Sequence, residues 1–267
     1  MLETHRNTNR ELWAGWTAIH SRMNGGFYDL AAVQSGQTSL HRIELNEIGE
    51  VAGKSLLHLQ CHLGYDTISW ARLGARVTGV DFSPEAIAFA STLAQSLKVD
   101  VDFVCSDVYD IADSVPARFD IIFASYGVIP WLDDLRGWAR IIADRLRPGG
   151  KFYIVDFHPL LYALDNDGRT LKHDYLSSAQ PIHYVEYGSY ADPQAAFSHP
   201  CYIWSHGLGE VVDALVSAGL ALEFVREHPY SPYGSFPFLE QRADGLWWIK
   251  NNELKIPLLF SIRARRD

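Results

Sequence analysis

The chain lacks several features that would each assign it to a broad class of protein. It has no apolar run of about 18 residues, so a membrane span is not expected, and no charged-then-apolar leader follows Met1. Its formal net charge of −9 argues against extended contacts with nucleic-acid phosphates, which require clustered lysine and arginine. We therefore expect a cytoplasmic protein, monomer or homodimer, that binds a small molecule and neither nucleic acid nor a membrane.

Cysteine is also sparse. Cys61, Cys105 and Cys201 form an odd set without metal-ligand or disulfide spacing, so we expect reduced thiols and no metal site. The first two fall at the ends of predicted buried strands. Hydrophobic residues make up 48% of the 267 residues, which excludes a disordered chain and suits one large α/β domain that buries roughly three-quarters of its unfolded surface.

The most informative stretch alternates strand and helix and ends on an acid. Leu56 to Gln60 is a short apolar run typical of a buried parallel strand, and Tyr65 to Leu73 has helical apolar spacing. A second strand, Arg76 to Val80, follows directly. Asp81 then stands about 17 residues after Gly64, close to the spacing of roughly 20 at which an acid meets a ribose in nucleotide-binding βαβ units. The pattern predicts a nucleoside site.

The turn after the first predicted strand is poor in glycine, and this helps to decide which nucleoside-containing cofactor the site binds. A pyrophosphate is approached through several glycines, yet the turn QCHLGYD holds one, so NAD is disfavoured. The segment resembles the class I S-adenosylmethionine-dependent methyltransferases, whose first loop commonly reads (D/E)xGxGxG. His58 stands at the usual acidic position, Gln60 and His62 replace the first two glycines, and Gly64 remains. The loop is similar to that of a bacterial subgroup with an HLQCH-type sequence.

Later segments extend the resemblance. Val101 to Cys105 is a predicted third strand, followed by Ser106-Asp107-Val108. The resemblance implies that Asp107 meets the adenine amino group and that a backbone N–H of this segment meets the ring. Phe119 to Ser125 (FDIIFAS) is a predicted fourth strand whose opening is typical of the family, and Tyr126 begins the loop beyond it.

The remaining elements complete an expected fold. Apolar spacing predicts a helix over Leu132 to Leu146, ended by Arg-Pro-Gly-Gly, and a fifth strand over Lys151 to Phe157. A helix over Leu208 to Ala218 is followed by apolar strands at Ala221 to Glu227 and Pro257 to Arg263. The resemblance implies an α/β Rossmann-like methyltransferase fold, with a seven-stranded, mostly parallel sheet and a terminal antiparallel hairpin.

One methyltransferase domain, 1–267, is expected to contain four parts. These are an N-terminal helical cap (1–53), a cofactor-binding core (54–157), a substrate-side insertion (158–206), and a C-terminal helix and hairpin (207–267). The aromatic cap is expected either to close over the cofactor or to pack on the sheet or a dimer partner, and both can hold. The tyrosine- and histidine-rich insertion predicts a lid or substrate pocket, because long connections at this sheet edge build substrate sites. The proline-rich HPYSPYGSFPF loop is a candidate for the far wall.

The candidate site residues follow from these positions. The predicted cofactor-binding residues are Gln60, His62, Gly64, Asp81, Phe82, Asp107, Val108 and Tyr126. Asp81 is preferred for the ribose because Ser83 already supplies a helix cap, whereas Asp107 can instead cap the segment after it. His58 is expected to be a core histidine. For a hydroxyl or amine acceptor, His158, at the end of the fifth strand, is the predicted catalytic base because a histidine titrates near neutrality. The competing candidates are His183, His199 and His206, and Asp156 is an alternative group for orienting the substrate.

The predicted function is methyl transfer from S-adenosylmethionine to a small-molecule acceptor, leaving S-adenosylhomocysteine. In-line displacement at a sulfonium depends mainly on alignment and desolvation, so no dedicated motif is obligatory. Two alternatives remain at this point. The altered loop is compatible with a catalytically silent S-adenosylmethionine-binding protein, and the ribose-binding acid is shared with NAD-dependent oxidoreductases.

Overall fold

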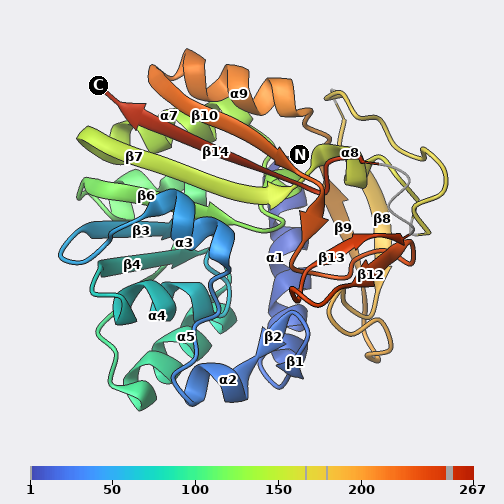
Figure 1. Ribbon diagram of the computed structural model, residues 1–267, viewed down its shortest axis with the longest axis horizontal. Coiled ribbons are helices and arrows are strands. Elements are labelled where there is room, and N and C mark those ends of the chain that lie inside the picture. The colour runs from blue at the N-terminus through green and yellow to red at the C-terminus, as the bar shows by residue number, and fades with distance from the viewer. Residues whose placement is uncertain (1, 166, 179, 251–254) are drawn as a thin grey trace.

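A seven-stranded sheet forms the centre of the computed structural model, which describes residues 2–165, 167–178, 180–250 and 255–267 (Figure 1). The strand order is β10-β14-β7-β6-β3-β4-β5. The strands are β3 (Ser55–Leu59), β4 (Arg76–Asp81), β5 (Asp102–Cys105), β6 (Phe119–Ser125), β7 (Leu146–Phe157), β10 (Leu220–His228) and β14 (Leu259–Arg266). β14 runs antiparallel to both β7 and β10, and the pairs from β7 to β5 are parallel. The predicted fold class is confirmed.

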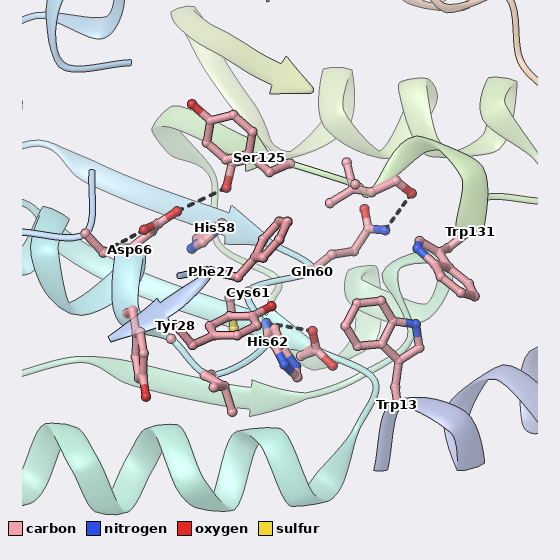
Figure 2. Close-up of a pocket in the computed structure, with 18 of the residues that line it drawn as sticks. Trp13, Phe27, Tyr28, His58, Gln60, Cys61, His62, Asp66, Ser125 and Trp131 are labelled. Carbon is pink, nitrogen blue, oxygen red and sulfur yellow. Dashed lines mark hydrogen bonds between the residues drawn. The ribbon is translucent and has the colours of Figure 1, made fainter. Parts of the chain in front are cut away.

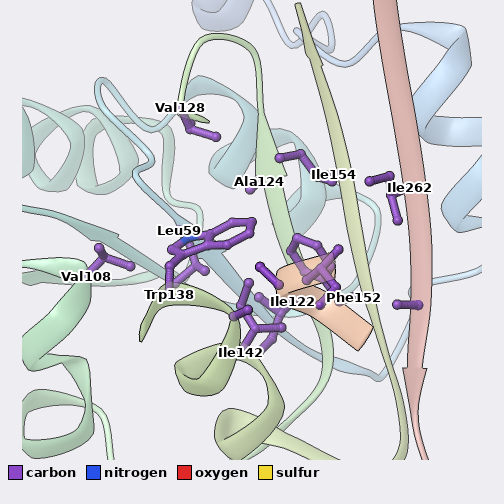
Figure 3. Close-up of a cluster of buried hydrophobic side chains, with 14 of the residues drawn as sticks. Leu59, Val108, Ile122, Ala124, Val128, Trp138, Ile142, Phe152, Ile154 and Ile262 are labelled. Carbon is purple, nitrogen blue, oxygen red and sulfur yellow. The ribbon is translucent and has the colours of Figure 1, made fainter. Parts of the chain in front are cut away.

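Helices cover both faces of this sheet. The residues of β6 alternate between the two faces: Ile122 and Ala124 join the core under α7 (Leu135–Arg145) and α9 (Leu208–Ser217), and Phe123 joins the opposite core. That second face is covered by α3 (Arg42–Ile48), α4 (Tyr65–Arg72) and α5 (Pro84–Leu97). Trp138 packs in the first core edge-on to Phe152, with ring centroids 5.4 Å apart (Figure 3). Parallel strands buried on both faces explain the continuous apolar runs in the sequence.

The structure differs most from the sequence-based expectations at β7, α7, β14 and one cysteine. β14 spans Leu259–Arg266 and not Pro257 to Arg263. β7 begins at Leu146 and not at Lys151, because Leu146 pairs with Phe119 across an irregularity in the ladder. α7 begins three residues later than predicted, at Leu135, because a 3₁₀ turn occupies 129–131. All three thiols are free, but Cys105 is exposed and not buried as predicted. It closes the edge strand β5, where none of the described strands covers it.

The remaining elements lie mostly beyond the carboxyl ends of the strands. They are α1 (Leu2–His20), β1 (Asn24–Gly25), β2 (Tyr28–Asp29), α2 (Leu30–Gln34), η1 (Val108–Asp110), α6 (Ile111–Ser114), η2 (Ile129–Trp131), α8 (Pro159–Tyr162), β8 (Ile182–Tyr187), β9 (Ser198–Ile203), β11 (Tyr230–Ser231), β12 (Leu239–Gln241) and β13 (Trp247–Ile249). Helix α1 runs between the sheet and the β8–β9 and β11–β13 sheets (Figure 1). Among the described helices, none is long and apolar enough to cross a membrane.

Polar contacts at both ends fix α1 at this edge. Asn9 exchanges two hydrogen bonds with the backbone of Tyr202 on β9: its Nδ2 donates to the carbonyl at 2.7 Å, and its Oδ1 accepts from the N–H at 2.9 Å. At the other end, His20 Nδ1 lies 2.9 Å from His62 Nε2. This bond requires one donor and one acceptor, so it suits two neutral imidazoles. Burial lowers the pKa of His20 to about 3, which keeps the ring neutral at physiological pH.

The buried His20 predicts a pH dependence of stability. A histidine whose folded-state pKa lies below its unfolded value of about 6.5 contributes stability above that pH, and the contribution is lost as pH falls from 6.5 towards 3. Between pH 7.5 and 5.0 the wild type should lose about 2 kcal/mol more unfolding free energy than His20→Phe. Urea titrations at both pH values measure this. The exposed-site control His183→Phe should follow the wild type. Equal pH slopes for His20→Phe and the wild type would contradict the assignment.

Candidate active site

A cavity opens at the carboxyl ends of β3, β4, β5 and β6, next to α1 (Figure 2). Its wall contains all eight predicted cofactor-binding residues: Gln60, His62, Gly64, Asp81, Phe82, Asp107, Val108 and Tyr126. The predicted base His158 is not among the residues that line it. Four strand ends therefore contribute to one site, as expected for a parallel sheet whose strand order reverses beside β3.

The loop after β3 keeps a glycine-type backbone with few glycines. Its φ angle is 55° at Gln60, 44° at His62 and 72° at Gly64, the three positions at which the family pattern has glycine. A Cβ on Gly64 would lie 2.6 Å from Phe103 Cζ and 2.9 Å from Ala90 Cβ, so both conformation and packing require glycine there. At the other two positions the chain accepts a strained backbone, at a cost of order 1–3 kcal/mol each, and presents side chains to the cavity.

Those two side chains leave polar atoms unpaired in the cavity wall. Gln60 Nε2 donates to the carbonyl of Val128 at 3.3 Å, whereas Gln60 Oε1 and His62 Nδ1 are buried with no partner among the described residues. A buried unsatisfied polar atom costs about 1–3 kcal/mol. An acceptor such as Gln60 Oε1 fits the ammonium or hydroxyl groups of S-adenosylmethionine, so the residues present suit that cofactor.

Asp81 links the loop after β3 to the turn after β4. Its Oδ2 accepts from the N–H of His62 at 2.8 Å, and its Oδ1 accepts from the N–H of Ser83 at 2.9 Å. Ser83 Oγ accepts from the N–H of Ala86 at 3.2 Å, which confirms the predicted cap of α5. A carboxylate has about four acceptor positions, so two remain for a ligand. Burial raises the pKa of Asp81 to about 6, and the backbone N–H bonds oppose that shift.

Asp107 lines the cavity beyond the end of β5 and caps the short helix η1. Its Oδ1 accepts from the N–H of Tyr109 at 3.1 Å, so it caps η1, the alternative considered from the sequence. It still lines the cavity, together with Val108 and Phe82. Arg10 of α1 covers this end, with its guanidinium carbon 5.6 Å from the Phe82 ring centre. The apolar side chains of Phe82 and Val108 in the cavity wall suit a planar base.

A buried acid shapes the loop after β6. The Asp156 carboxylate accepts hydrogen bonds from the N–H groups of Gly127, Val128 and Ile129, the last two at 3.0 and 3.1 Å. Burial raises the pKa of Asp156 to about 6, opposed by these bonds. They fix the chain directly after Tyr126, whose φ of 43° is also left-handed. Asp156 thus positions Tyr126 in the cavity and does not itself line it.

The cavity continues past Tyr126 into an aromatic chamber. Rings from distant segments meet there: Phe27 and Tyr28 from the cap, Tyr190 from the insertion and Tyr233 from the proline-rich loop. The Tyr28 and Tyr190 hydroxyls share a hydrogen bond. All three segments that the sequence predicts near the substrate therefore contribute to the cavity wall.

Sequence reasoning missed the polar groups beside these rings. Asp66 lies two residues after Gly64 and accepts hydrogen bonds from Ser39 Oγ at 2.6 Å and Ser125 Oγ at 3.2 Å (Figure 2). His41 also lines the cavity, directly before α3. The available signal was His41 with a glutamate three residues later, a helix-capping pattern, and its N–H does donate to Glu44 at 2.7 Å. A pattern of that kind predicts a helix start and says nothing of a site.

His158 and His58 have structural contacts. His158 Nδ1 accepts from the N–H of Leu160 at 3.2 Å, and its Nε2 lies 2.9 Å from Glu227 Oε1. Burial lowers the pKa of His158, and the nearby Glu227 opposes this. Its catalytic role stays a prediction. His58 is buried as expected, with Nδ1 2.8 Å from Thr67 Oγ1, a side chain and not a backbone group, but it also lines the cavity.

Comparison with known proteins finds a methyltransferase domain in this chain. A family model described as a methyltransferase domain matches residues 57–152. A ubiquinone biosynthesis O-methyltransferase from Xanthomonas euvesicatoria pv. vesicatoria is 26% identical over 223 residues, 82% of this chain and 85% of the relative.

Two solved structures share the fold. An S-adenosylmethionine-dependent methyltransferase from Mesorhizobium loti has a TM-score of 0.57 and 23% identity, over 84% of this chain and 96% of that one. A putative S-adenosylmethionine-dependent methyltransferase from Listeria monocytogenes has a TM-score of 0.59 and 18% identity, over 89% and 99%. The HLQCH-type subgroup stays a prediction. The matched domain, the relatives and the fold agree: the chain is a methyltransferase enzyme with the Rossmann-like fold of the S-adenosylmethionine-dependent methyltransferases, which points to S-adenosylmethionine as its cofactor.

Proposed function

We propose that this enzyme methylates a small organic molecule in the cavity at the carboxyl edge of its sheet. The observation that carries the proposal is one continuous cavity, lined at one end by the predicted cofactor residues and at the other by aromatic rings. The relative that acts in ubiquinone biosynthesis is named as an O-methyltransferase, which supports a hydroxyl acceptor. The net charge of −9 works against polyanionic substrates.

Cofactor contacts are assigned by position along the cavity. Asp107, Val108 and Phe82 hold the adenine, and Asp81 binds the ribose hydroxyls through its remaining lone pairs. The methionine end lies beside four residues: Gln60, His62, Gly64 and Tyr126. When bound, S-adenosylmethionine supplies an electrophilic methyl group on a sulfonium. The chain's contribution is to hold that group in line with the acceptor and to exclude water.

Water exclusion is assigned to α1. Trp13 lines the cavity and packs edge-on against His62, with ring centroids 5.0 Å apart, and against Trp131, 5.3 Å away. It thereby joins α1 to the loop after β3 and to the turn after β6. Such a contact closes the cavity over a bound cofactor, as active-site lids do.

Asp81 provides the test of cofactor binding. Asp81→Ala should weaken S-adenosylmethionine binding by roughly 10- to 150-fold, the loss expected for charge-assisted hydrogen bonds worth about 1.5–3 kcal/mol. Titration calorimetry of the purified protein measures this, and NAD should not bind at comparable concentration. Asp81→Asn keeps one acceptor oxygen and should lose less. Asp110→Ala, outside the cavity wall, is the matched control. Unchanged affinity in Asp81→Ala would make this residue structural, and tighter binding of NAD would overturn the cofactor assignment.

Trp13 provides the test of closure. Trp13→Ala should weaken S-adenosylhomocysteine binding about tenfold or more, because a large aromatic side chain that covers the ligand contributes roughly 1.5–3 kcal/mol by burial. Calorimetry measures the affinity and urea unfolding checks the fold. Trp248→Ala, on β13 and outside the cavity wall, should bind as the wild type does. If both variants bind equally well, α1 is not a lid.

A further inference from the structure

The aromatic end of the cavity contains a paired histidine and tyrosine. His41 Nε2 lies 3.2 Å from the Tyr233 hydroxyl, and both residues line the cavity. When Nε2 carries no proton, the hydroxyl is the donor in this bond. The two residues are 192 positions apart and come from the segment before α3 and from the turn after β11. Nothing in the cofactor assignment above uses either of them.

Aromatic rings pack around this pair. Phe27 stacks on Tyr233, with ring centroids 4.4 Å apart and planes 7° from parallel. Tyr126 stands edge-on to Tyr233 at 5.3 Å and 86°. Tyr126 also directs its hydroxyl away, donating to Glu44 Oε2 at 3.1 Å. These three rings contact one another and line the cavity together, and an aromatic wall of this kind suits a planar ring, since aromatic groups prefer stacked and edge-to-face contacts.

The charge in this part of the cavity excludes anions. Asp66 presents its carboxylate beside the His41 segment, held by Ser39 and Ser125. Among the described residues lining the cavity, the one lysine or arginine is Arg6, and its Nη2 is 2.7 Å from Asp133 Oδ1. A carboxylate-bearing ligand would therefore face a like charge without a free cation. A neutral ligand with a hydroxyl meets no such penalty.

The same carboxylate favours a proton on His41. Burial lowers the pKa of His41, and the negative charge of Asp66 opposes that shift. If His41 takes up a proton, the negative charge of Asp66 stabilises the resulting imidazolium. Asp66 does this without itself contacting the acceptor. His41 thus has a ring nitrogen in the cavity, a hydrogen bond to the Tyr233 hydroxyl and the negative charge of Asp66 nearby. His158 lacks this arrangement, because its two ring nitrogens face Leu160 and Glu227.

We propose that Phe27, Tyr126 and Tyr233 form the acceptor subsite for a neutral, planar, hydroxyl-bearing ring, and that His41 accepts the acceptor's proton through the Tyr233 hydroxyl. The proposal rests on the proposed methyl transfer and names its substrate class. As the acceptor oxygen forms its bond to the methyl carbon, the carbon–sulfur bond breaks and sulfur keeps the electron pair. The acceptor's proton passes to the Tyr233 oxygen while the Tyr233 proton passes to His41 Nε2, so the products are a methyl ether, a neutral thioether and an imidazolium. The imidazolium then releases its proton to solvent.

Binding is tested with two planar probes of similar size in the presence of saturating S-adenosylhomocysteine. Catechol, which is neutral, should bind saturably, and benzoate, an anion, should bind at least tenfold more weakly. Phe27→Ala should weaken catechol binding about tenfold through loss of the stacked wall, with S-adenosylhomocysteine affinity unchanged. Absence of saturable catechol binding, or equal binding of benzoate, overturns the subsite.

Proton transfer is tested by turnover of catechol, measured as S-adenosylhomocysteine formed. His41→Gln should lower kcat by roughly 10²- to 10⁴-fold with KM within about threefold, and should reduce the fall in rate expected at acidic pH, to which Asp81 and Asp156 also contribute. Tyr233→Phe should lower kcat in the same way. The matched controls, His173→Gln and Tyr187→Phe, lie outside the cavity wall and should retain wild-type rates. An unchanged kcat in His41→Gln, or catechol bound but not methylated, overturns the assignment.

Failure of this proposal can be distinguished from failure of the proposed function. If S-adenosylmethionine binds and Asp81→Ala weakens it, the cofactor assignment stands whatever the result with catechol. If His158→Ala loses turnover and His41→Gln does not, the proton leaves by the route predicted from the sequence, and the His41 relay is wrong. If neither cofactor form binds, both proposals fail together.

Discussion

The cavity depends on the carboxylate of Asp81, which joins two turns through backbone contacts. It accepts from the N–H of His62 in the loop after β3 and from the N–H of Ser83 at the start of α5. Because both donors are backbone groups, these bonds form whatever side chains the loop carries. The bond to His62 helps to hold that residue in a left-handed conformation, at a position where the family pattern has glycine. The strain is maintained because the surrounding structure over-determines the loop.

Three segments outside the cofactor-binding core complete the cavity. Trp13 comes from α1, Tyr190 from the insertion after β7, and Tyr233 from the segment between β10 and β14. None of them belongs to the central sheet. The central sheet thus carries the predicted cofactor-binding residues at its strand ends. The three segments outside the sheet supply aromatic side chains to the cavity wall. That division is expected where one fold serves many acceptors, since function resides in the sites built on the fold.

Local patterns predicted most of the regular elements. β6 has the predicted bounds, and α4 and α9 each end one residue earlier than predicted. Both helices end near a glycine, so the stop signal is local. The start of β7 could not be predicted this way, because it depends on pairing between Leu146 and Phe119. The prediction that Cys105 is buried was wrong for a related reason. Burial of a residue at the end of β5 depends on whether another strand covers that edge of the sheet, and none of the described strands does.

The sequence by itself determined the succession of strands and helices along the chain and the place of Asp81 at a strand end. These follow from periodicity and from the rule that parallel strands end at one edge. Only the tertiary structure decided which side chains face the cavity. It turned His158 towards Glu227 and brought His41 within 3.2 Å of Tyr233. Contacts between segments so far apart depend on the packing of whole elements, which no local pattern encodes.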